Sequence, residues 1–406
     1  MEARMTHIVV IGAGQAGSSL VTKLRTTGFD GDITLIGAED VPPYQRPPLS
    51  KAYLLGDMTE ERLYLRPTAF YADNSIALRL NTHATSVNSA AKSITLSDGS
   101  TIIYDKLAFT TGSYPRNLPA AIGGMLEGVF SVRDLRDANE IAPAFIKGKK
   151  VLIIGGGYIG LEAAAVASKL GLKVTLVEMG DRILQRVAAT QTSDFFRNLH
   201  ILNGVDMREG VGLDRLLGDD HVSGAILTDG SKIDIDFAIV GVGIMPATAL
   251  AETAGVTVEN GIVTNDHAQT SNPDIYAAGD CATLTFKNQT IRLESVGNAI
   301  AQAEVAAQNM GGGDVAYTPK PWFWSDQYDC KLQIAGLNIG YDTVHVRMGD
   351  KGQSHWYYQG NTLLAVDAMN DPRNFMIGKR LIEAGHSPSP AQITNPNTDM
   401  KALLKP

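Results

Sequence analysis

Apolar runs that end in glycine-rich turns are the clearest feature of the hydrophobic pattern along this chain. Residues 7–11 form a largely β-branched run, and the glycine-rich stretch 12–17 follows it directly. Residues 18–25 then have a helical pattern, and residues 33–36 form the next apolar run. A continuous apolar run is typical of a parallel strand that is buried on both faces of its sheet. The pattern therefore predicts a strand–helix–strand unit.

The same pattern returns roughly 140 residues later, which is about the length of one domain. Residues 151–154 form the apolar run and residues 155–160 the glycine-rich turn. An alanine-rich helix is expected at 161–170, followed by a strand at 173–177 that ends at Glu178. The chain is therefore expected to contain two units of one kind.

Two hairpins and a third region are expected in the rest of the chain. Residues 94–96 and 102–104 flank the turn Ser97-Asp98-Gly99, and residues 225–227 and 233–235 flank Asp229-Gly230. A third region is expected from Lys320, with an irregular tail from Ser387 that is rich in Pro, Asn and Ser. Its strands are expected at 332–335, 344–347 and 363–366, and its helix at 373–384.

Both glycine-rich turns read G-x-G-x-x-G. The glycines are Gly12, Gly14 and Gly17 in the first copy and Gly155, Gly157 and Gly160 in the second. In such a motif the first glycine permits the tight turn, the second lets the backbone approach a pyrophosphate, and the third lets helix and strand pack closely. The phosphates then lie at the positive end of the helix dipole. One copy alone could be a structural turn, but two copies in this context predict two dinucleotide sites.

An acidic residue at the end of the second strand is expected to bind the adenosine ribose. Glu39 and Glu178 have this place in the two copies. Two dinucleotide sites in one chain suggest a bound flavin and an exchangeable nicotinamide, with hydride transfer between them. Glu178 would repel the 2′-phosphate of NADPH and so favours NADH. Arg182 is close in sequence and could instead meet a phosphate.

Composition and charge narrow the function further. The chain has 406 residues and a formal net charge of −8, which argues against nucleic-acid or membrane binding. No apolar run is long enough to span a bilayer, and the first residues carry no secretory signal, so a cytoplasmic location is expected. The two cysteines, Cys281 and Cys330, are expected to be buried thiols, and no metal site is expected.

Two longer motifs are R-P-P-L-S-K within residues 43–54 and P-W-F-W-S-D at residues 321–326. They resemble specific motifs of putidaredoxin-reductase-type ferredoxin reductases. Weaker matches lie at residues 133–135, 155–162, 270–281 and 294–299, so that the resemblance covers residues 6–384. Two departures are Thr110-Thr111-Gly112 in place of Ala-Thr-Gly, and Glu39 one residue later than the acid of many members.

The resemblance implies a fold and a set of site residues. The fold would be α/β, with two Rossmann-like (glutathione-reductase-like) dinucleotide-binding domains and a small α+β C-terminal domain. The FAD domain would comprise residues 1–112 and 246–318, the NADH domain residues 113–245 and the C-terminal domain residues 319–406. FAD would be held by Gly12, Gly14, Ala16, Gly17, Glu39, Arg46, Lys51, Ala84, Arg133, Asp280, Val296 and Trp324. NADH would be bound by Gly155, Gly157, Gly160 and Glu178.

Lys51, Glu162 and Trp324 are the candidate catalytic residues by the same resemblance. Lys51, expected near a helix start, would lie beside the flavin, stabilise the negative charge of the reduced ring and pair with Glu162. Without the resemblance, Lys51 reads as a solvated lysine and the tryptophans as core aromatics. Trp322 and Trp324 are expected on opposite faces of an extended segment, with Trp324 toward the flavin. Asp280 is also expected to cap a helix.

The stretch Val41–Lys51 contains no cysteine, whereas disulfide reductases of similar architecture need a redox-active pair there. Electrons are therefore expected to leave the flavin directly. No histidine, including His7, His83 and His200, is assigned a role.

The function implied is an NADH-dependent ferredoxin reductase that serves a cytochrome P450 or Rieske-type oxygenase. Its partner would be an acidic [2Fe–2S] ferredoxin, docked on a local basic patch to which Arg66 could contribute. The chain would be a monomer or a weak dimer. Two alternatives stay open: a reductase of a small acceptor such as monodehydroascorbate, a quinone or oxygen, and a redox-sensing flavoprotein of the apoptosis-inducing-factor type.

Overall fold

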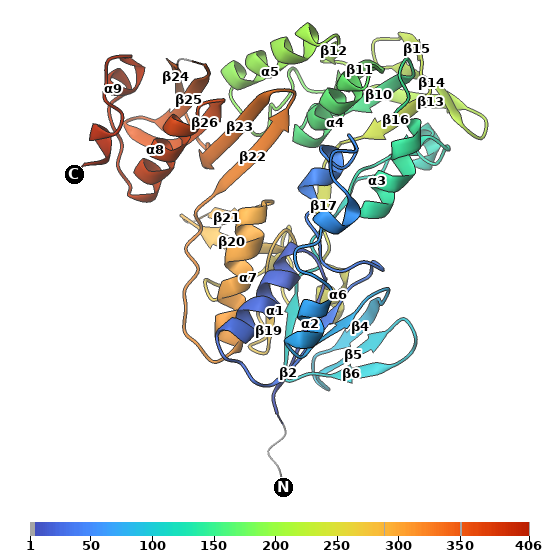
Figure 1. The fold of residues 1–406 in the computed structure, drawn as a ribbon, viewed down its shortest axis with the longest axis vertical. Coiled ribbons are helices and arrows are strands. Elements are labelled where there is room, and N and C mark those ends of the chain that lie inside the picture. Colours follow the sequence, from blue (N-terminus) through green and yellow to red (C-terminus); the bar gives the residue numbers. More distant parts are fainter. Residues whose placement is uncertain (1–4, 288, 350, 406) are drawn as a thin grey trace. The chain divides into compact units, whose positions relative to one another are not determined.

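The computed structural model describes residues 5–405 except 288 and 350, and it forms two compact units (Figure 1). The first unit contains the chain up to Gln45, Glu60–Tyr114 and Ile244–Pro321. The second contains Arg46–Thr59, Pro115–Gly243 and the chain from Trp322 onward. Among the described residues, no helix is long and apolar enough to cross a membrane.

The first unit is built around a parallel five-stranded sheet with the strand order β19-β7-β1-β2-β3. Helices α1 (Gln15–Thr26) and α7 (Val296–Met310) lie side by side and pack on it, α7 through an alanine-rich face (Figure 1). The sheet strands are β1 (His7–Ile11), β2 (Asp32–Ile36), β3 (Ile76–Arg79), β7 (Lys106–Phe109) and β19 (Ile275–Ala277). Smaller elements are α2 (Ala69–Asp73), β4 (Ala84–Asn88), β5 (Ser93–Leu96), β6 (Thr101–Ile103), α6 (Ala249–Thr253), β18 (Ile262–Val263), β20 (Ala282–Phe286) and β21 (Gln289–Ile291).

Strand β1 shows why the apolar runs predicted this sheet. Ile8 and Val10 pack into the cluster beneath α1 and α7, while Val9 and Ile11 pack into a second cluster on the other face. All four side chains are buried, because successive residues of a strand point to opposite faces. Burial on both faces requires an uninterrupted apolar run, as the sequence has.

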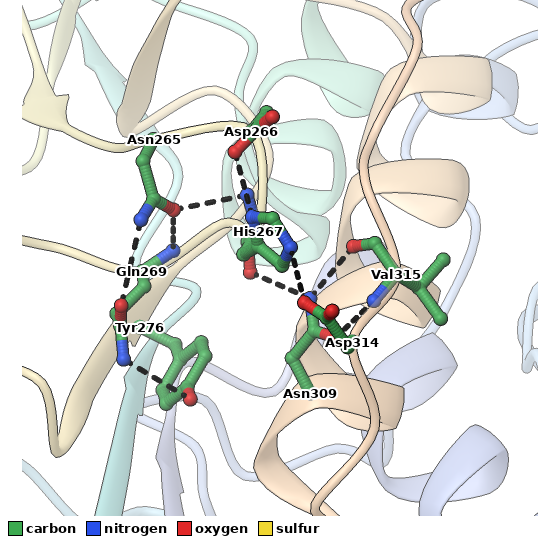
Figure 2. Close-up of polar contacts among 8 residues, drawn as sticks. All are labelled: Asn265, Asp266, His267, Gln269, Tyr276, Asn309, Asp314 and Val315. Atoms are coloured by element: carbon green, nitrogen blue, oxygen red, sulfur yellow. Dashed lines mark hydrogen bonds and ion pairs between the residues drawn. The ribbon is translucent and has the colours of Figure 1, made fainter.

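The chain leaves α7 through a set of polar contacts shown in Figure 2. Asn309 donates to the carbonyl oxygens of His267 and Val315 and accepts a bond from the Val315 amide. His267 lies between the carboxylates of Asp266 and Asp314, at 2.6 and 2.8 Å, and its hydrogen bond to Asp266 is the main cause that raises its pKa. These contacts fix the loop before β19 to the segment that follows α7.

The second unit contains another parallel sheet, with the order β12-β11-β10-β16-β9. Its strands are β9 (Val129–Phe130), β10 (Lys150–Ile154), β11 (Lys173–Glu178), β12 (Asp206–Glu209) and β16 (Phe237–Val240). Its helices are α3 (Leu135–Ile141), α4 (Tyr158–Lys169) and α5 (Thr190–Leu202), and the expected hairpin is present within β13 (Leu213–Gly218), β14 (Val222–Leu227) and β15 (Lys232–Asp234). Residues 160–167 of helix α4 are all buried, which accounts for the alanine content of this segment.

The C-terminal part of the second unit is an antiparallel sheet with the order β22-β23-β26-β25-β24, covered by α8. Its elements are β22 (Trp322–Gln327), β23 (Cys330–Gly336), β24 (Thr343–Met348), β25 (Gln353–Gln359), β26 (Thr362–Met369), α8 (Pro372–Glu383) and α9 (Pro390–Thr394). Strand β25 was not predicted. The described tail from Ser387 is irregular, as predicted, except for α9, which a capping box of Ser389 and Gln392 starts, and a 3₁₀ turn at Ala402–Leu404.

The tail is anchored by a buried arginine. The Arg347 guanidinium donates to the backbone carbonyl oxygens of Ile393 and Asn395 at 2.7 Å, and its second terminal nitrogen reaches those of Pro396 and Thr398. The side chain is 8% exposed, so these bonds lie largely away from water.

We expect Arg347→Ala to lower the free energy of unfolding of the second unit by about 3 kcal/mol, because it leaves buried carbonyl groups without donors. Denaturant unfolding followed by tryptophan fluorescence measures the loss. Arg373→Ala is the matched control: Arg373 meets Asp399 at 3.7 Å with a 63% exposed side chain, and such surface pairs contribute about 0.5 kcal/mol. Equal losses in the two variants would contradict the anchoring role.

Candidate functional site

The first glycine-rich turn joins β1 to α1 and has the backbone that a diphosphate requires. Gly12 has φ +112°, and a Cβ there would lie 2.2 Å from the carbonyl oxygen of Thr110. A Cβ on Gly17 would lie 2.0 Å from the carbonyl oxygen of Gly12, whereas a Cβ on Gly14 would meet nothing within 4 Å. At the first and third glycines, backbone atoms therefore occupy the space that a side chain would need. At the second glycine this space is open.

The second turn, between β10 and α4, repeats this geometry. Gly155 has φ +107°, and a Cβ there would lie 2.4 Å from the carbonyl oxygen of Gly241. A Cβ on Gly160 would lie 2.1 Å from the Gly155 oxygen, and one on Gly157 would meet nothing within 4 Å. In both turns the helix begins at the open glycine without a side-chain cap, so its first N–H groups are available to phosphate oxygens. Both turns therefore fit a dinucleotide.

The two acidic residues lie where the sequence predicts. Glu178 is the last residue of β11, and its carboxylate accepts hydrogen bonds from the Gly156 and Gly180 amides, both at 2.7 Å. It therefore lies directly beside the second glycine-rich turn. Glu39 follows β2 and accepts a 2.6 Å bond from the Tyr44 hydroxyl, a partner that was not predicted.

Three arginines near the second turn have different surroundings. The Arg182 guanidinium donates to the Ser193 hydroxyl at 2.5 Å and is thereby held toward α5. Arg116 and Arg186, which sequence reasoning missed, both approach Gly243: a Cβ on that glycine would lie 3.8 Å from Arg116 Cδ and from an Arg186 terminal nitrogen. Gly243 follows β16, so the two arginines lie at the carboxyl edge of the same sheet as Glu178.

The other residues predicted in the first unit are Asp280, Val296 and Ala84. A Cβ on Gly279 would lie 3.1 Å from the Cβ of Ala16 and 3.7 Å from that of Ala299, so the turn that carries Asp280 lies between α1 and α7. Val296 is the first residue of α7. Ala84 is the first residue of β4.

The expectation that Asp280 caps a helix was wrong. It precedes strand β20 and accepts a 3.1 Å hydrogen bond from the Ser113 hydroxyl, while Ser295 caps α7. The error arose because a Gly-Asp pair after a strand is equally compatible with a turn between two strands.

Lys51 and Glu162 form an ion pair inside the second unit. Lys51 Nζ lies 2.6 Å from Glu162 Oε2, and their side chains are 17% and 5% exposed. Lys51 directly follows the short 3₁₀ helix Pro47–Ser50, so it ends a helix rather than starting one, contrary to the prediction. Glu162 comes from α4, which begins at the second glycine-rich turn.

Two serines complete the surroundings of Glu162. Ser50 donates to Glu162 Oε2 at 3.0 Å and Ser325 donates to Oε1 at 2.7 Å. Burial raises the pKa of Glu162, and the charge of Lys51 together with the hydrogen bonds from Lys51 and the serines opposes that rise. Both serines were missed, although each belongs to one of the two specific motifs, R-P-P-L-S-K and P-W-F-W-S-D.

The aromatic residues of β22 correct the prediction about the two tryptophans. Trp322 and Trp324 stack with their ring centroids 5.4 Å apart and an interplanar angle of 21°, so they share one face of the strand. Residues i and i+2 of a strand point the same way, which the prediction had reversed. Phe323 points to the other face and packs against Tyr158, at 4.8 Å between centroids.

Arg46 and Arg133 are also brought together in the second unit. Arg46 donates to the backbone carbonyl oxygen of Arg133 at 2.9 Å. Asp134, the next residue, forms a capping box with Asp137 at the start of α3. The backbone at Arg133 and Asp134 is therefore fixed by the hydrogen bond from Arg46 and by the capping box of α3.

Neither cysteine is suited to redox chemistry. Cys281 and Cys330 are free, buried thiols, as expected. Burial raises the pKa of both, that of Cys330 to about 12, so neither forms the thiolate that disulfide exchange requires.

Two dinucleotide-binding folds in one chain, each with an open glycine-rich turn, define a flavin- and nicotinamide-dependent oxidoreductase. Residues 6–308 match the family described as pyridine nucleotide-disulphide oxidoreductase, and residues 322–404 match the reductase C-terminal family. The chain belongs to the pyridine nucleotide-disulphide oxidoreductase family. This confirms the predicted α/β class.

Relatives of known role match over their whole length. Putidaredoxin reductase of Pseudomonas putida is 39% identical, over 98% of this chain and 96% of its own. The ferredoxin–NAD(+) reductase component of the anthranilate 1,2-dioxygenase system of Burkholderia cepacia is 37% identical, over 98% of each chain. The solved covalent putidaredoxin reductase–putidaredoxin complex matches with a TM-score of 0.95 and 39% identity, over 98% of each chain. The predicted resemblance to this kind of reductase is confirmed.

Proposed function

We propose that this chain is an NADH-dependent ferredoxin reductase that holds FAD in its first unit and binds NADH in its second. The observation that carries the proposal is the repeated geometry of the two glycine-rich turns, with the middle glycine open in both. The match to oxygenase-system reductases over whole chains supports the same function.

The residues present fit both cofactors. FAD would be held at Gly12, Gly14, Ala16, Gly17, Glu39, Ala84, Asp280 and Val296, with Arg46, Lys51, Arg133 and Trp324 as further expected contacts. NADH would be held at Gly155, Gly157, Gly160 and Glu178, and Arg116 and Arg186 provide positive charge for its diphosphate. Bound FAD supplies the conversion from a two-electron hydride donor to single-electron transfers. Lys51 would supply a positive charge for the reduced ring, and Glu162, its ion-pair partner, would orient that lysine.

The electron acceptor we propose is a [2Fe–2S] ferredoxin that serves a P450 or Rieske-type oxygenase, in the cytoplasm. The absence of a thiolate-forming cysteine supports direct transfer from flavin to partner. Arg66, whose guanidinium lies 5.3 Å from the centre of the Phe70 ring, is held in a defined position as a docking candidate. We further propose that the enzyme works as a monomer or a weak dimer.

Stopped-flow spectroscopy without oxygen tests the function. NADH should bleach the yellow protein, and oxidised [2Fe–2S] ferredoxin should restore the colour in two one-electron steps. Reoxidation by quinone or oxygen, with none by a panel of ferredoxins, would instead favour the small-acceptor reductase. Sluggish bleaching by NADH would favour the redox-sensing alternative.

Glu178 should determine the choice of nicotinamide. We expect Glu178→Ala to reduce the preference for NADH over NADPH by about 100-fold, because the carboxylate no longer repels the 2′-phosphate or binds the ribose. The ratio of kcat/KM for the two nucleotides measures this change. Since Arg182 is engaged by Ser193, Arg182→Ala should leave the ratio within a factor of about three. A larger change in the preference with Arg182→Ala than with Glu178→Ala would show that Arg182 discriminates between the two nucleotides.

A further inference from the structure

A continuous row of hydrogen bonds leads from Glu162 to a histidine on another helix of the second unit. Ser325 donates to Glu162 Oε1 at 2.7 Å, and Gln327 Nε2 donates to Ser325 Oγ at 3.1 Å. Gln327 Oε1 lies 2.8 Å from Nε2 of His200, on α5. The Tyr328 hydroxyl lies 3.3 Å from His200 Nδ1.

The row follows from the alternation of side chains along β22. Phe323, Ser325 and Gln327 share one face of this strand and meet, in turn, Tyr158 and Glu162 of α4 and His200 of α5. Ser325, Gln327 and His200 are each 0% exposed. Buried polar groups of this kind are costly to leave unpaired, so each link of the row depends on the next.

The chemistry of the groups gives the row a single direction. A carboxylate can only accept, so Ser325 must donate to Glu162 and accept from Gln327. The Gln327 amide then offers its oxygen to His200, which must donate from Nε2. Burial lowers the pKa of His200 to about 4, so the ring is neutral at pH 7 with its proton on Nε2 and accepts at Nδ1. Every donor in the row therefore points toward Glu162.

We propose that Ser325, Gln327 and His200 are positioning residues that hold Glu162 ionised and aimed at Lys51. The proposal rests on the proposed function, in which Lys51 lies beside the flavin. The row orients the Glu162 carboxylate and does not conduct protons. To relay a proton, the Gln327 amide would have to form its unstable imidic acid tautomer. Sequence reasoning assigned His200 no role, since only the fold brings it opposite residue 327.

Besides Asp367, which acts on Tyr158 and whose pKa burial raises to about 6, few titratable groups face this row among the described residues. Lys51 and Tyr158 face Glu162 from the chain after the 3₁₀ helix and from α4. Tyr328 faces His200, and Cys330 is the strand partner of Gln327 across β22 and β23. The pKa of each of these phenols and of the thiol is raised by burial, so none changes charge near neutral pH.

The test uses variants that cut the row and one that restores it. Gln327→Leu and His200→Leu remove a link, whereas His200→Gln keeps an N–H donor near the place of Nε2. Thr192→Val is the matched control, because Thr192 is buried on the same helix but bonds to His355 and Asp367, outside the row. Ser325→Ala removes the donor to Glu162 directly and serves if the leucine variants do not fold.

The first readout is the single-turnover rate of flavin bleaching by NADH between pH 5.5 and 9. Loss of an oriented donor raises the pKa of Glu162, so the cut variants should be about fivefold slower than the parent at pH 6 and unchanged at pH 8.5. His200→Gln should recover most of the rate, and Thr192→Val should match the parent. Identical pH profiles for cut and control variants would overturn the proposal.

The second readout does not depend on turnover. Nitrogen-15 NMR of the imidazole in the FAD-loaded parent should show His200 neutral with its proton on Nε2, and Gln327→Leu should remove this fixed tautomer. A proton on Nδ1 in the parent would overturn the direction of the row. If NADH failed to bleach the parent protein, the proposed function would be refuted. The tautomer of His200 would still test the hydrogen-bond row, because its measurement does not require turnover.

Discussion

Gly12→Ala should purify as a colourless protein, whereas Gly155→Ala should purify yellow and resist bleaching by NADH. Both glycines have φ above +100°, and an added Cβ would lie 2.2 and 2.4 Å from a backbone carbonyl oxygen. Neither the conformation nor the contact can be relieved by a side-chain rotation, so the turn must change shape. A displaced turn moves the amides from the phosphates, and we expect affinity for the dinucleotide to fall at least about 100-fold.

Absorbance of the purified protein measures FAD retention, and rapid mixing with NADH measures the second site. Gly99→Ala is the control, because Gly99 has φ +81° in the β5–β6 turn but an added Cβ would meet nothing within 4 Å. It should lower stability by roughly 1 kcal/mol and leave both cofactors bound. If Gly12→Ala abolished NADH bleaching but kept its FAD, the assignment of the two turns would have to be exchanged.

The nucleotide-binding folds were predictable because their information is local. A buried strand, a glycine-rich turn and a helix follow one another within about 20 residues. Each glycine of the turn is needed for the backbone conformation, for close packing of the backbone or for its approach to the pyrophosphate. Glu39 and Glu178 could be placed for the same reason, since Glu178 is the last residue of β11 and Glu39 follows shortly after the end of β2 at Ile36. The resemblance supplied Lys51 and Glu162, which lie far apart in sequence, and the structure brings them together.

The features that were missed depend on contacts between distant segments. Strand β25 contains Trp356, Tyr357 and Tyr358, all fully buried, and such a run has no alternation that marks it as a strand. Residues 46–59 belong with the second unit although they lie between two segments of the first. Ser325 and His200 have no pattern of their own, and only the packing of β22 on α4 and α5 shows what they contact.

Lys51→Met should slow flavin reduction by NADH at least about 100-fold, because in the proposed function it removes the fixed positive charge that would stabilise the reduced ring. It should also destabilise the second unit by about 3 kcal/mol, because it leaves the buried Glu162 carboxylate without its counter-ion. Loss of rate and loss of stability would then coincide, and the single variant could not tell a catalytic lysine from a structural one.

The double variant Lys51→Met/Glu162→Gln separates the two roles. Replacing both partners removes the two charges together and leaves no buried anion on α4 without a counter-ion, so most of the stability should return. The rate should not return, because the positive charge is still missing. Single-turnover bleaching and denaturant unfolding of the parent, both single variants and the double variant complete the cycle. Recovery of the rate along with stability would show that Lys51 acts only by neutralising Glu162, and that the charge beside the flavin must come from another residue.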